Sequence, residues 1–217
     1  EQWGLDAVWL AELHFNPQRS VLSAPLTIAS AVAARTTRVK IGTAVQVLPL
    51  HHPLRLAEDT ATIDHISQGR LIFGVGRSGF ATTYQPYGVP YAESRERFAE
   101  TLDIVKRAWT ERTFSHTGAF FQFHNVTLAP KPFQKPHPPI LIGGSGEQVT
   151  LRVVARQANL WNYANGDIET FRHKVKVLHQ HCAEVGRDPQ EIELSTQYRV
   201  DGDDLPRHFA DRGAAGR

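Results

Sequence analysis

The sequence predicts an α/β fold in which helices cover a parallel β-sheet, and its length indicates an incomplete (β/α)8 barrel. Apolar runs that read as strands alternate with helical segments roughly six times, the order typical of a parallel sheet. A doubly wound sheet and a barrel both fit this order. A complete barrel takes roughly 250 residues. The 217 residues therefore predict a barrel that lacks its first strand, or both its first and its last.

Each expected strand is a short apolar segment bounded by glycine, proline or charged residues. The expected strands are residues 8–12, 39–48, 70–77, 140–144, 160–164 and 191–200.

Apolar side chains spaced three to four residues apart predict helices between these strands. Phe98, Leu102 and Val105 show this spacing, and Ser94 is placed to cap their helix. Gly69 suits the left-handed end of the helix before it. The expected helices are residues 24–36, 54–66, 94–111, 147–157 and 168–185.

Residues 113–138 interrupt the alternation and predict an excursion from the core. The segment carries aromatic alternation in FFQFHNVTL and then APKPFQKPHPP, whose prolines exclude a helix or a central strand. We expect one partial barrel domain over residues 1–200, with residues 201–217 as a tail or a truncated helix. The chain has no methionine and opens on EQWGLDAVWL, so we expect a fragment that lacks its true start.

The composition is that of a globular protein and excludes several classes of partner. The 24 basic and 22 acidic residues leave a net charge of +2 without a basic block, so no nucleic acid is expected. A single cysteine fits a reducing compartment, and no apolar run approaches the ~20 residues that cross a membrane. We expect a cytoplasmic protein.

The strand ends carry the functional residues, because the site of a parallel sheet lies at the carboxyl ends of its strands. The turn Gly143, Gly144, Ser145, Gly146 leads into a helix, so free backbone N–H groups could bind an anion. The competing interpretation is that these glycines only allow the chain to turn and bind no ligand. Arg77 ends the strand that a barrel places alongside, and a guanidinium can bind phosphate through two hydrogen bonds. Together these residues predict a phosphorylated cofactor.

Blocks spread over residues 4–195 carry a family resemblance. In order they read VWLAELHF, GTAVQVLPLHHPLRLAED, SQGRLIFGVGRSGF, ESRERFAETLDIVKRAWTE, LAPKPFQKPHPPILIGG and GRDPQEIELS. Together they resemble the bacterial luciferase-like family of flavin-dependent monooxygenases and related deazaflavin enzymes. The resemblance implies a (β/α)8 barrel with an excursion after its fourth strand, a cofactor that is FMN or the deazaflavin coenzyme F420, and a homodimer.

The same resemblance assigns the cofactor-binding residues. It implies that the phosphate binds Arg77 and the turn of Gly143, Gly144, Ser145 and Gly146, where the strand-end argument expects an anion.

It also implies that Thr43, Ala44 and Val45 lie under the flavin ring, with a cis peptide bond between Ala44 and Val45.

The paired His51 and His52 in QVLPLHHP suggest a metal, a substrate contact or plain turn chemistry. Adjacent histidines in a tight turn diverge, and no second ligand cluster accompanies them, so no metal is expected. Pro53 suits the first turn of the helix that follows. We expect His51 and His52 at the rim of the cofactor pocket, as structural residues or as weak substrate contacts.

The AELHF block departs from the luciferase pattern. The family commonly has two adjacent histidines after the glutamate, whereas this chain has Leu13 and then His14. His14 is the candidate catalytic acid or base, because histidine changes charge near neutral pH, and Glu12 is the alternative. Under the resemblance, the missing first histidine argues against light emission.

Three functions remain open on this basis. The favoured one is a monooxygenase that uses reduced FMN, delivered by a separate flavin reductase, and oxygen on a small organic substrate. The second is an F420-dependent enzyme that transfers a hydride without oxygen. The third is a flavin-binding relative without turnover.

Overall fold

The computed structural model describes residues 1–164 and 168–197 of the chain. Within these residues, seven strands form one sheet in the order β1, β2, β4, β7, β8, β9, with β3 as a further neighbour of β4, and all its pairings are parallel. The strands are β1 (Ala7–Leu10), β2 (Lys40–Thr43), β3 (Gln46–Val47), β4 (Leu71–Gly76), β7 (Ile140–Gly143), β8 (Leu160–Tyr163) and β9 (Glu193–Thr196).

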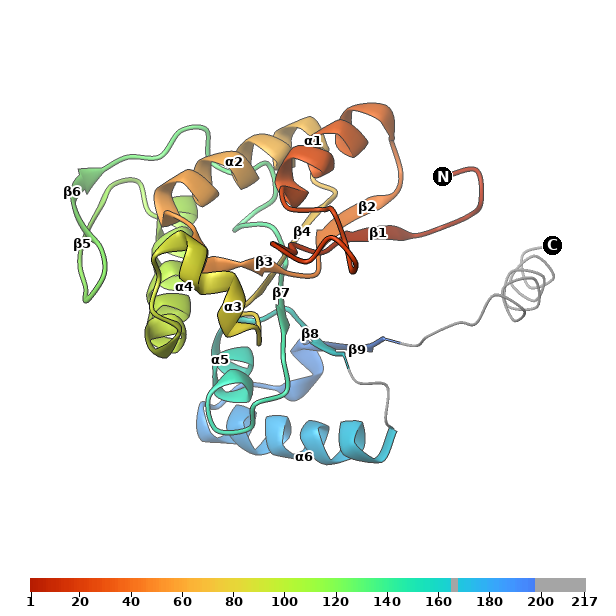
Figure 1. The fold of residues 1–217 in the computed structure, drawn as a ribbon, viewed down its shortest axis with the longest axis vertical. Helices are drawn as coiled ribbons and strands as arrows, with labels where there is room; N and C mark the ends of the chain where they lie inside the picture. The colour runs from red at the N-terminus through yellow and green to blue at the C-terminus, as the bar shows by residue number, and fades with distance from the viewer. Residues whose placement is uncertain (165–167, 198–217) are drawn as a thin grey trace.

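Helices alternate with these strands along the chain. They are α1 (Pro25–Arg35), α2 (Pro53–Ile66), α3 (Ala81–Tyr84), α4 (Ser94–Thr110), α5 (Thr150–Gln157) and α6 (Ile168–Glu184). Proline opens α1 and α2, where its missing N–H breaks no helical hydrogen bond. Figure 1 shows α1, α2 and α4 around one half of the sheet, and α5 and α6 around the other half.

The two faces of the sheet differ, which distinguishes a half-barrel from a doubly wound sheet. Phe73 and Val75 of β4 belong to the main core with the helices, whereas Ile72 packs with Leu141 and Leu160 on the opposite face. A doubly wound sheet would carry helices on both faces. The curled sheet with its helices on the outer face confirms the predicted α/β fold, an incomplete barrel.

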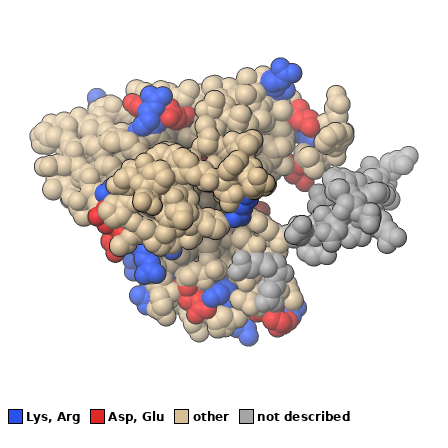
Figure 2. Space-filling view, viewed as in Figure 1, with Lys and Arg blue, Asp and Glu red and all other residues tan. Residues whose placement is uncertain are grey.

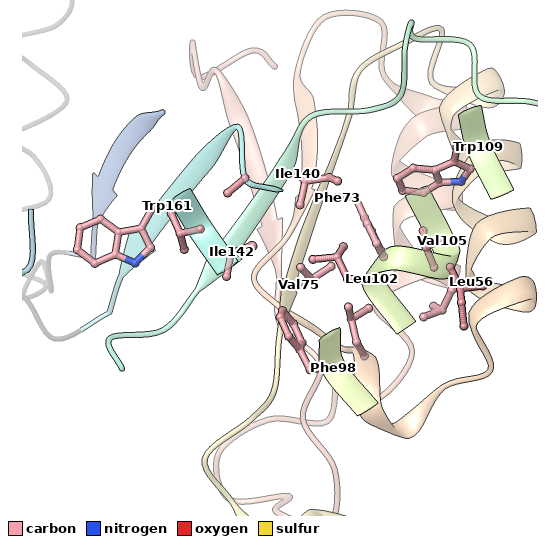
Figure 3. Packing of buried hydrophobic residues seen from close by; sticks show 14 of the residues in the cluster. Leu56, Phe73, Val75, Phe98, Leu102, Val105, Trp109, Ile140, Ile142 and Trp161 are labelled. Carbon is pink, nitrogen blue, oxygen red and sulfur yellow. The ribbon is translucent and has the colours of Figure 1, made fainter. Parts of the chain in front are cut away.

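The main core joins β4 and β7 to α2 and α4. Phe73 meets the indole of Trp109 edge to face, with 5.4 Å between ring centroids. The buried Trp109 donates a hydrogen bond from its Nε1 to the carbonyl of Ala57 at 3.1 Å, so its polar atom is satisfied. Figure 3 shows the side chains of Phe98, Leu102 and Val105 from α4 directed at this core. The stripe seen in the sequence is therefore the face that fixes α4 on the sheet.

The prediction of one continuous strand over residues 39–48 is wrong. β2 ends at Thr43, a cis peptide joins Ala44 to Val45, and the chain resumes as the short β3 and a 3-10 turn at Leu48–Leu50. The N–H of Ala44 still bonds the carbonyl of Leu10 at 2.8 Å. Apolar composition runs through the break, so the sequence pattern gave no sign of it.

Other element boundaries also differ from prediction: the strand expected over residues 8–12 is Ala7–Leu10, and the strand expected from residue 191 begins at Glu193 after a 3-10 turn. The helix expected from residue 147 begins at Thr150, because the glycine-rich turn continues for three more residues. Ser94 is the first residue of α4 rather than a cap, and its hydroxyl donates to the carbonyl of Tyr91 at 2.5 Å. The end of the last expected strand, residues 198–200, and the tail at 201–217 lie outside the described residues.

The predicted excursion contains an antiparallel hairpin of β5 (Phe114–Thr117) and β6 (Gln122–Val126). The proline-rich segment after it returns the chain to the sheet. Gln134 anchors that segment, since its backbone N–H and side-chain amide both donate to the buried carboxylate of Asp64, at 2.8 and 2.7 Å.

Charges of both signs are interspersed on the face drawn in Figure 2, where the described residues form no continuous basic stripe of the kind that binds nucleic acid. None of the helices within residues 1–164 and 168–197 has the length and hydrophobicity to cross a bilayer.

Arg70 ties the end of α1 to the sheet. Its guanidinium and Nε donate hydrogen bonds of 2.7 to 2.9 Å to the carbonyls of Ser67, Val39, Ala33 and Thr36, and to the Thr36 hydroxyl. The carbonyls of Ala33, Thr36 and Ser67 lie where α1 and α2 end, so no helical N–H follows to satisfy them, and the Val39 carbonyl directly precedes β2.

We expect Arg70→Ala to lower the free energy of unfolding by about 2 to 4 kcal/mol, because several partly buried carbonyls would lose a charged donor. Urea denaturation would measure the change. The control is Arg112→Ala, since Arg112 is exposed and should change stability by no more than about 0.5 kcal/mol. Equal effects of the two substitutions would contradict this role of Arg70.

Candidate functional site

A cavity of about 740 Å³ lies at the carboxyl ends of β4 and β7. Both groups that the strand-end argument singled out line it, namely Arg77 after β4 and the turn of residues 143–146 after β7. β4 and β7 are paired along Phe73 to Val75, which brings their ends together. The structure thus places the predicted guanidinium and the glycine turn in one wall.

Close packing explains why the turn after β7 uses glycine. A Cβ on Gly143 would lie 2.8 Å from Cγ1 of Val45, and Gly144 has a φ of +136° that side chains rarely adopt. The carbonyl of Gly144 accepts a hydrogen bond from Nε1 of Trp161 at 2.8 Å. The turn is therefore held from both sides, with its backbone open to the cavity.

Arg77 is held in place by the start of α4. Its Nη1 donates to the Ser94 hydroxyl at 3.0 Å, and its guanidinium carbon lies 5.1 Å from the ring centroid of Tyr91. The hydroxyl of Tyr84 donates to the Arg77 carbonyl, and burial raises the pKa of Tyr84, so this donor keeps its proton. One polar contact leaves the guanidinium with further N–H groups for a ligand.

Sequence reasoning missed two other cations in this cavity. Arg95 of α4 lines it and has no hydrogen bond or ion pair with any described residue. Lys174 of α6 also lines it and contacts Glu147 at 2.5 Å. That hydrogen bond lowers the pKa of Glu147, which therefore stays ionised. The side of a helix that faces a cavity depends on tertiary packing. The segments ESRER and HKVK each contain two Arg or Lys residues, but their sequence does not show which of these faces the cavity.

Thr43, Ala44 and Val45 lie on the inner face of the sheet, and the peptide between Ala44 and Val45 is cis, as the resemblance implied. The Thr43 hydroxyl donates to the carbonyl of Gly74 at 2.6 Å, and a Cβ on Gly74 would lie 1.6 Å from the Thr43 carbonyl oxygen. The side chain of Val45 covers Gly76, where a Cβ would come within 2.5 Å of it. Glycines thus let this segment lie directly on β4.

Ala44 also borders a second cavity of about 320 Å³ on the inner face, together with Trp9, Leu141 and Asn162. The ring of Trp9 lies over Gly42, where a Cβ would lie 2.2 Å from it. The inner face therefore offers an apolar wall next to the residues expected under a flavin ring.

Glu12 and His14, the candidate catalytic pair, are in direct contact. Oε1 of Glu12 lies 2.6 Å from Nε2 of His14 and 2.8 Å from Nε2 of His51. Oε2 accepts from the Gln46 amide at 2.6 Å and from the Val47 backbone N–H at 2.7 Å. The side chain of Glu12 is fully buried, yet both oxygens have two partners, which compensates for the loss of water.

Tyr87 completes this cluster at its outer side. Its hydroxyl lies 3.0 Å from Nδ1 of His14, and the two rings meet edge to face at 5.1 Å. Burial, and then the charge of Glu12, raise the pKa of Tyr87, so its hydroxyl remains a hydrogen-bond donor. Sequence reasoning missed Tyr87 and Gln46, because each reaches the cluster only through the folded chain.

His51 and His52 diverge, as adjacent histidines in a turn were expected to. His51 points to Glu12, whereas His52 precedes α2 and lies against the rings of Phe121 and Phe123 at 5.7 and 5.6 Å. The described residues contain no group of three or more histidine, cysteine or acidic side chains arranged to hold a metal ion.

The fold and the cavity together define an α/β barrel protein with a cavity lined by basic side chains at the carboxyl ends of its strands. The chain belongs to the luciferase-like monooxygenase family, whose model matches residues 1–201.

Relatives with assigned activities fall into two groups. The oxygenase component of the flavin-dependent trigonelline monooxygenase of Acinetobacter baylyi is 32% identical over 144 residues, which are 65% of this chain and 39% of that protein. The F420-dependent glucose-6-phosphate dehydrogenase of Kineococcus radiotolerans is 35% identical over 157 residues, 69% of this chain and 45% of that protein.

The monooxygenase RslO1 of Streptomyces bottropensis has a similar crystal structure, with a TM-score of 0.85 at 28% identity over 98% of this chain and 67% of that chain. A further curated relative, from Sinorhizobium fredii, is matched over 56% of its length. The chain thus spans about half the length of the curated relatives it matches. The family and these relatives support an oxidoreductase.

Proposed function

We propose that the protein is a flavin-dependent monooxygenase that uses reduced FMN and oxygen to oxidise a small organic substrate. The observation that carries the proposal is the cavity in which Arg77 and the turn of residues 143–146 meet. The donor set fits a phosphate, since a guanidinium, backbone N–H groups and two further cations line one wall. When bound, the flavin would supply the redox chemistry.

The chain's own residues would bind and orient that cofactor. Arg77 and Arg95 would neutralise the phosphate, whereas the charge of Lys174 is already balanced by the ionised Glu147. Ala44 and Val45 would support the ring on the inner face. His14 would hold or accept a proton at Nδ1, because its Nε2 is committed to Glu12. Glu12 would act through His14 by fixing its tautomer and orientation.

The second candidate is F420-dependent hydride transfer, and the dehydrogenase relative from Kineococcus radiotolerans favours it. The same cavity would then bind the phosphate of the deazaflavin. A non-catalytic flavin-binding protein is the third candidate.

A separate flavin reductase is part of the main proposal, because the Acinetobacter baylyi relative is the oxygenase component of its enzyme. The homodimer, the cytoplasmic location and the weak substrate contacts of His51 and His52 stay predictions from the sequence.

The three candidates differ in cofactor and in oxygen use. We expect reduced FMN to bind and its oxidation to consume oxygen faster than free reduced FMN does, which an oxygen electrode and stopped-flow absorbance would measure. Binding of reduced F420 without faster oxygen uptake would favour the dehydrogenase. FMN binding without any effect on oxygen uptake would favour the non-catalytic candidate, and binding of neither cofactor would contradict all three.

Arg77→Ala should weaken FMN binding roughly ten- to a hundredfold, because charge-assisted hydrogen bonds contribute about 1.5 to 3 kcal/mol each. Riboflavin lacks the phosphate, so its affinity should barely change. Fluorescence titration with both ligands would measure the two dissociation constants. Equal losses for both ligands would indicate damage to the fold and remove the phosphate role of Arg77.

Arg95→Ala should also weaken FMN more than riboflavin, by roughly three- to tenfold, because a second cation favours a doubly charged phosphate. Arg112→Ala is the matched control, since it removes the same charge from an exposed position after α4. FMN affinities that fall equally in both variants would mean that Arg95 acts through net charge alone. Raising the salt concentration should shrink the effect of Arg95→Ala.

A further inference from the structure

We propose that Glu12 and His51 form a proton relay between His14 and the solvent beside α2. Nε2 of His14 and Nε2 of His51 contact the same oxygen, Oε1 of Glu12, at 2.6 and 2.8 Å. The biological role of the relay rests on the proposed oxidoreductase function. The contacts that form the relay lie within this chain and involve no cofactor or substrate.

Of the three side chains, His51 alone has a substantial exposed fraction. The side chains of His14 and Glu12 are 5% and 0% exposed, whereas that of His51 is 32% exposed. His51 also lines a groove of about 290 Å³ beside the first turn of α2, next to Arg55 and Asp59. No described residue bonds its Nδ1. A proton that reaches His51 can therefore leave to water, whereas Glu12 itself has no direct exit.

The hydrogen bonds of His14 fix its starting state. Glu12 accepts at Oε1, so Nε2 of His14 carries a proton and Nδ1 is free to accept one. Tyr87, whose hydroxyl faces Nδ1, is the donor in that state. Nδ1 is thus the atom at which a proton would enter, and Nε2 is the atom from which one would pass to Glu12.

Gln46 prevents the hydrogen bonds of the cluster from favouring one protonation of Nε2 of His51 over the other. Nε2 of Gln46 lies 2.7 Å from Nε2 of His51 and 2.6 Å from Oε2 of Glu12. A proton on Nε2 of His51 suits Glu12 but opposes the amide of Gln46, whereas a bare Nε2 accepts from that amide. Each placement leaves one short contact unmatched, so the two placements compete.

The transfer balances as one proton in and one proton out. A proton binds Nδ1 of His14, the Nε2 proton passes to Oε1 of Glu12, and Oε1 passes it to the bare Nε2 of His51. The Nδ1 proton of His51 then leaves to water in the groove. When Nδ1 of His14 is protonated, the Tyr87 hydroxyl turns from donor to acceptor, and the Gln46 amide loses its acceptor on His51 when Nε2 of His51 is protonated. Transfer in the opposite direction restores the starting state.

The test is the exchange of the His14 Nε2 proton with water, followed by NMR with ¹⁵N-labelled protein. In His51→Gln, the amide can still donate to Glu12 but cannot pass a proton on. We expect the exchange rate to fall about tenfold or more. Added imidazole, which can enter the groove, should restore it.

His116→Gln is the matched control. His116 pairs with Glu100 at 3.0 Å, with side chains 12% and 10% exposed, and neither residue touches the cluster. Its substitution should leave exchange at His14 unchanged. His51→Asn replaces His51→Gln if circular dichroism shows that the glutamine variant is misfolded, and the expected result is the same.

Two results would overturn the relay. One is an unchanged exchange rate in the folded His51 variants. The other is a loss of exchange in Tyr87→Phe that equals or exceeds the loss in His51→Gln, because the proton would then leave past Tyr87. The assay uses neither cofactor nor substrate, so its failure would leave the proposed function standing, and failure of the cofactor titrations would leave the relay standing.

Discussion

The contact between residues 43–45 and the glycines of β4 and β7 is the constraint on which the rest of the site depends. A Cβ at Gly74 would come within 1.6 Å of the Thr43 carbonyl, and Gly143 leaves room for Val45. Because the segment lies this close to the sheet, β2 cannot continue straight. The chain breaks into β3, and the break sets the inner wall of the barrel at the carboxyl ends of its strands.

The same break connects the two parts of the site. Val45 accepts a backbone hydrogen bond from Glu12 at 3.2 Å, and the next two residues, Gln46 and Val47, donate to the Glu12 carboxylate. Val45 also packs against Gly143, at the start of the anion cavity. A shift of this short segment would therefore move the buried carboxylate and the glycine turn together. The geometry proposed to bind an anion and the geometry proposed to hold a proton are therefore coupled through residues 45–47.

The sequence predicted the half-barrel and the family, since apolar strands in alternation with helices and a series of ordered blocks are properties of the chain itself. Strand order alone also brings Arg77 beside the turn of residues 143–146. What it could not predict arises from tertiary contact. Gln46 and Tyr87 are ordinary polar residues until the fold brings them to Glu12 and His14, and apolar composition conceals the break after Thr43.

The arrangement also indicates where the two cofactor classes would be distinguished. FMN and the deazaflavin cofactor both carry a phosphate, so Arg77 and the glycine turn suit either. Under the proposal, discrimination would fall to the ring end of the cofactor, which would lie by the inner cavity bordered by Trp9, Ala44 and Leu141. His14 reaches the site from the end of β1, the strand that also carries Trp9. Oxygen chemistry and hydride transfer place different demands on a proton carrier, so the link between His14 and Glu12 would bear on which of the two proposed activities the protein has.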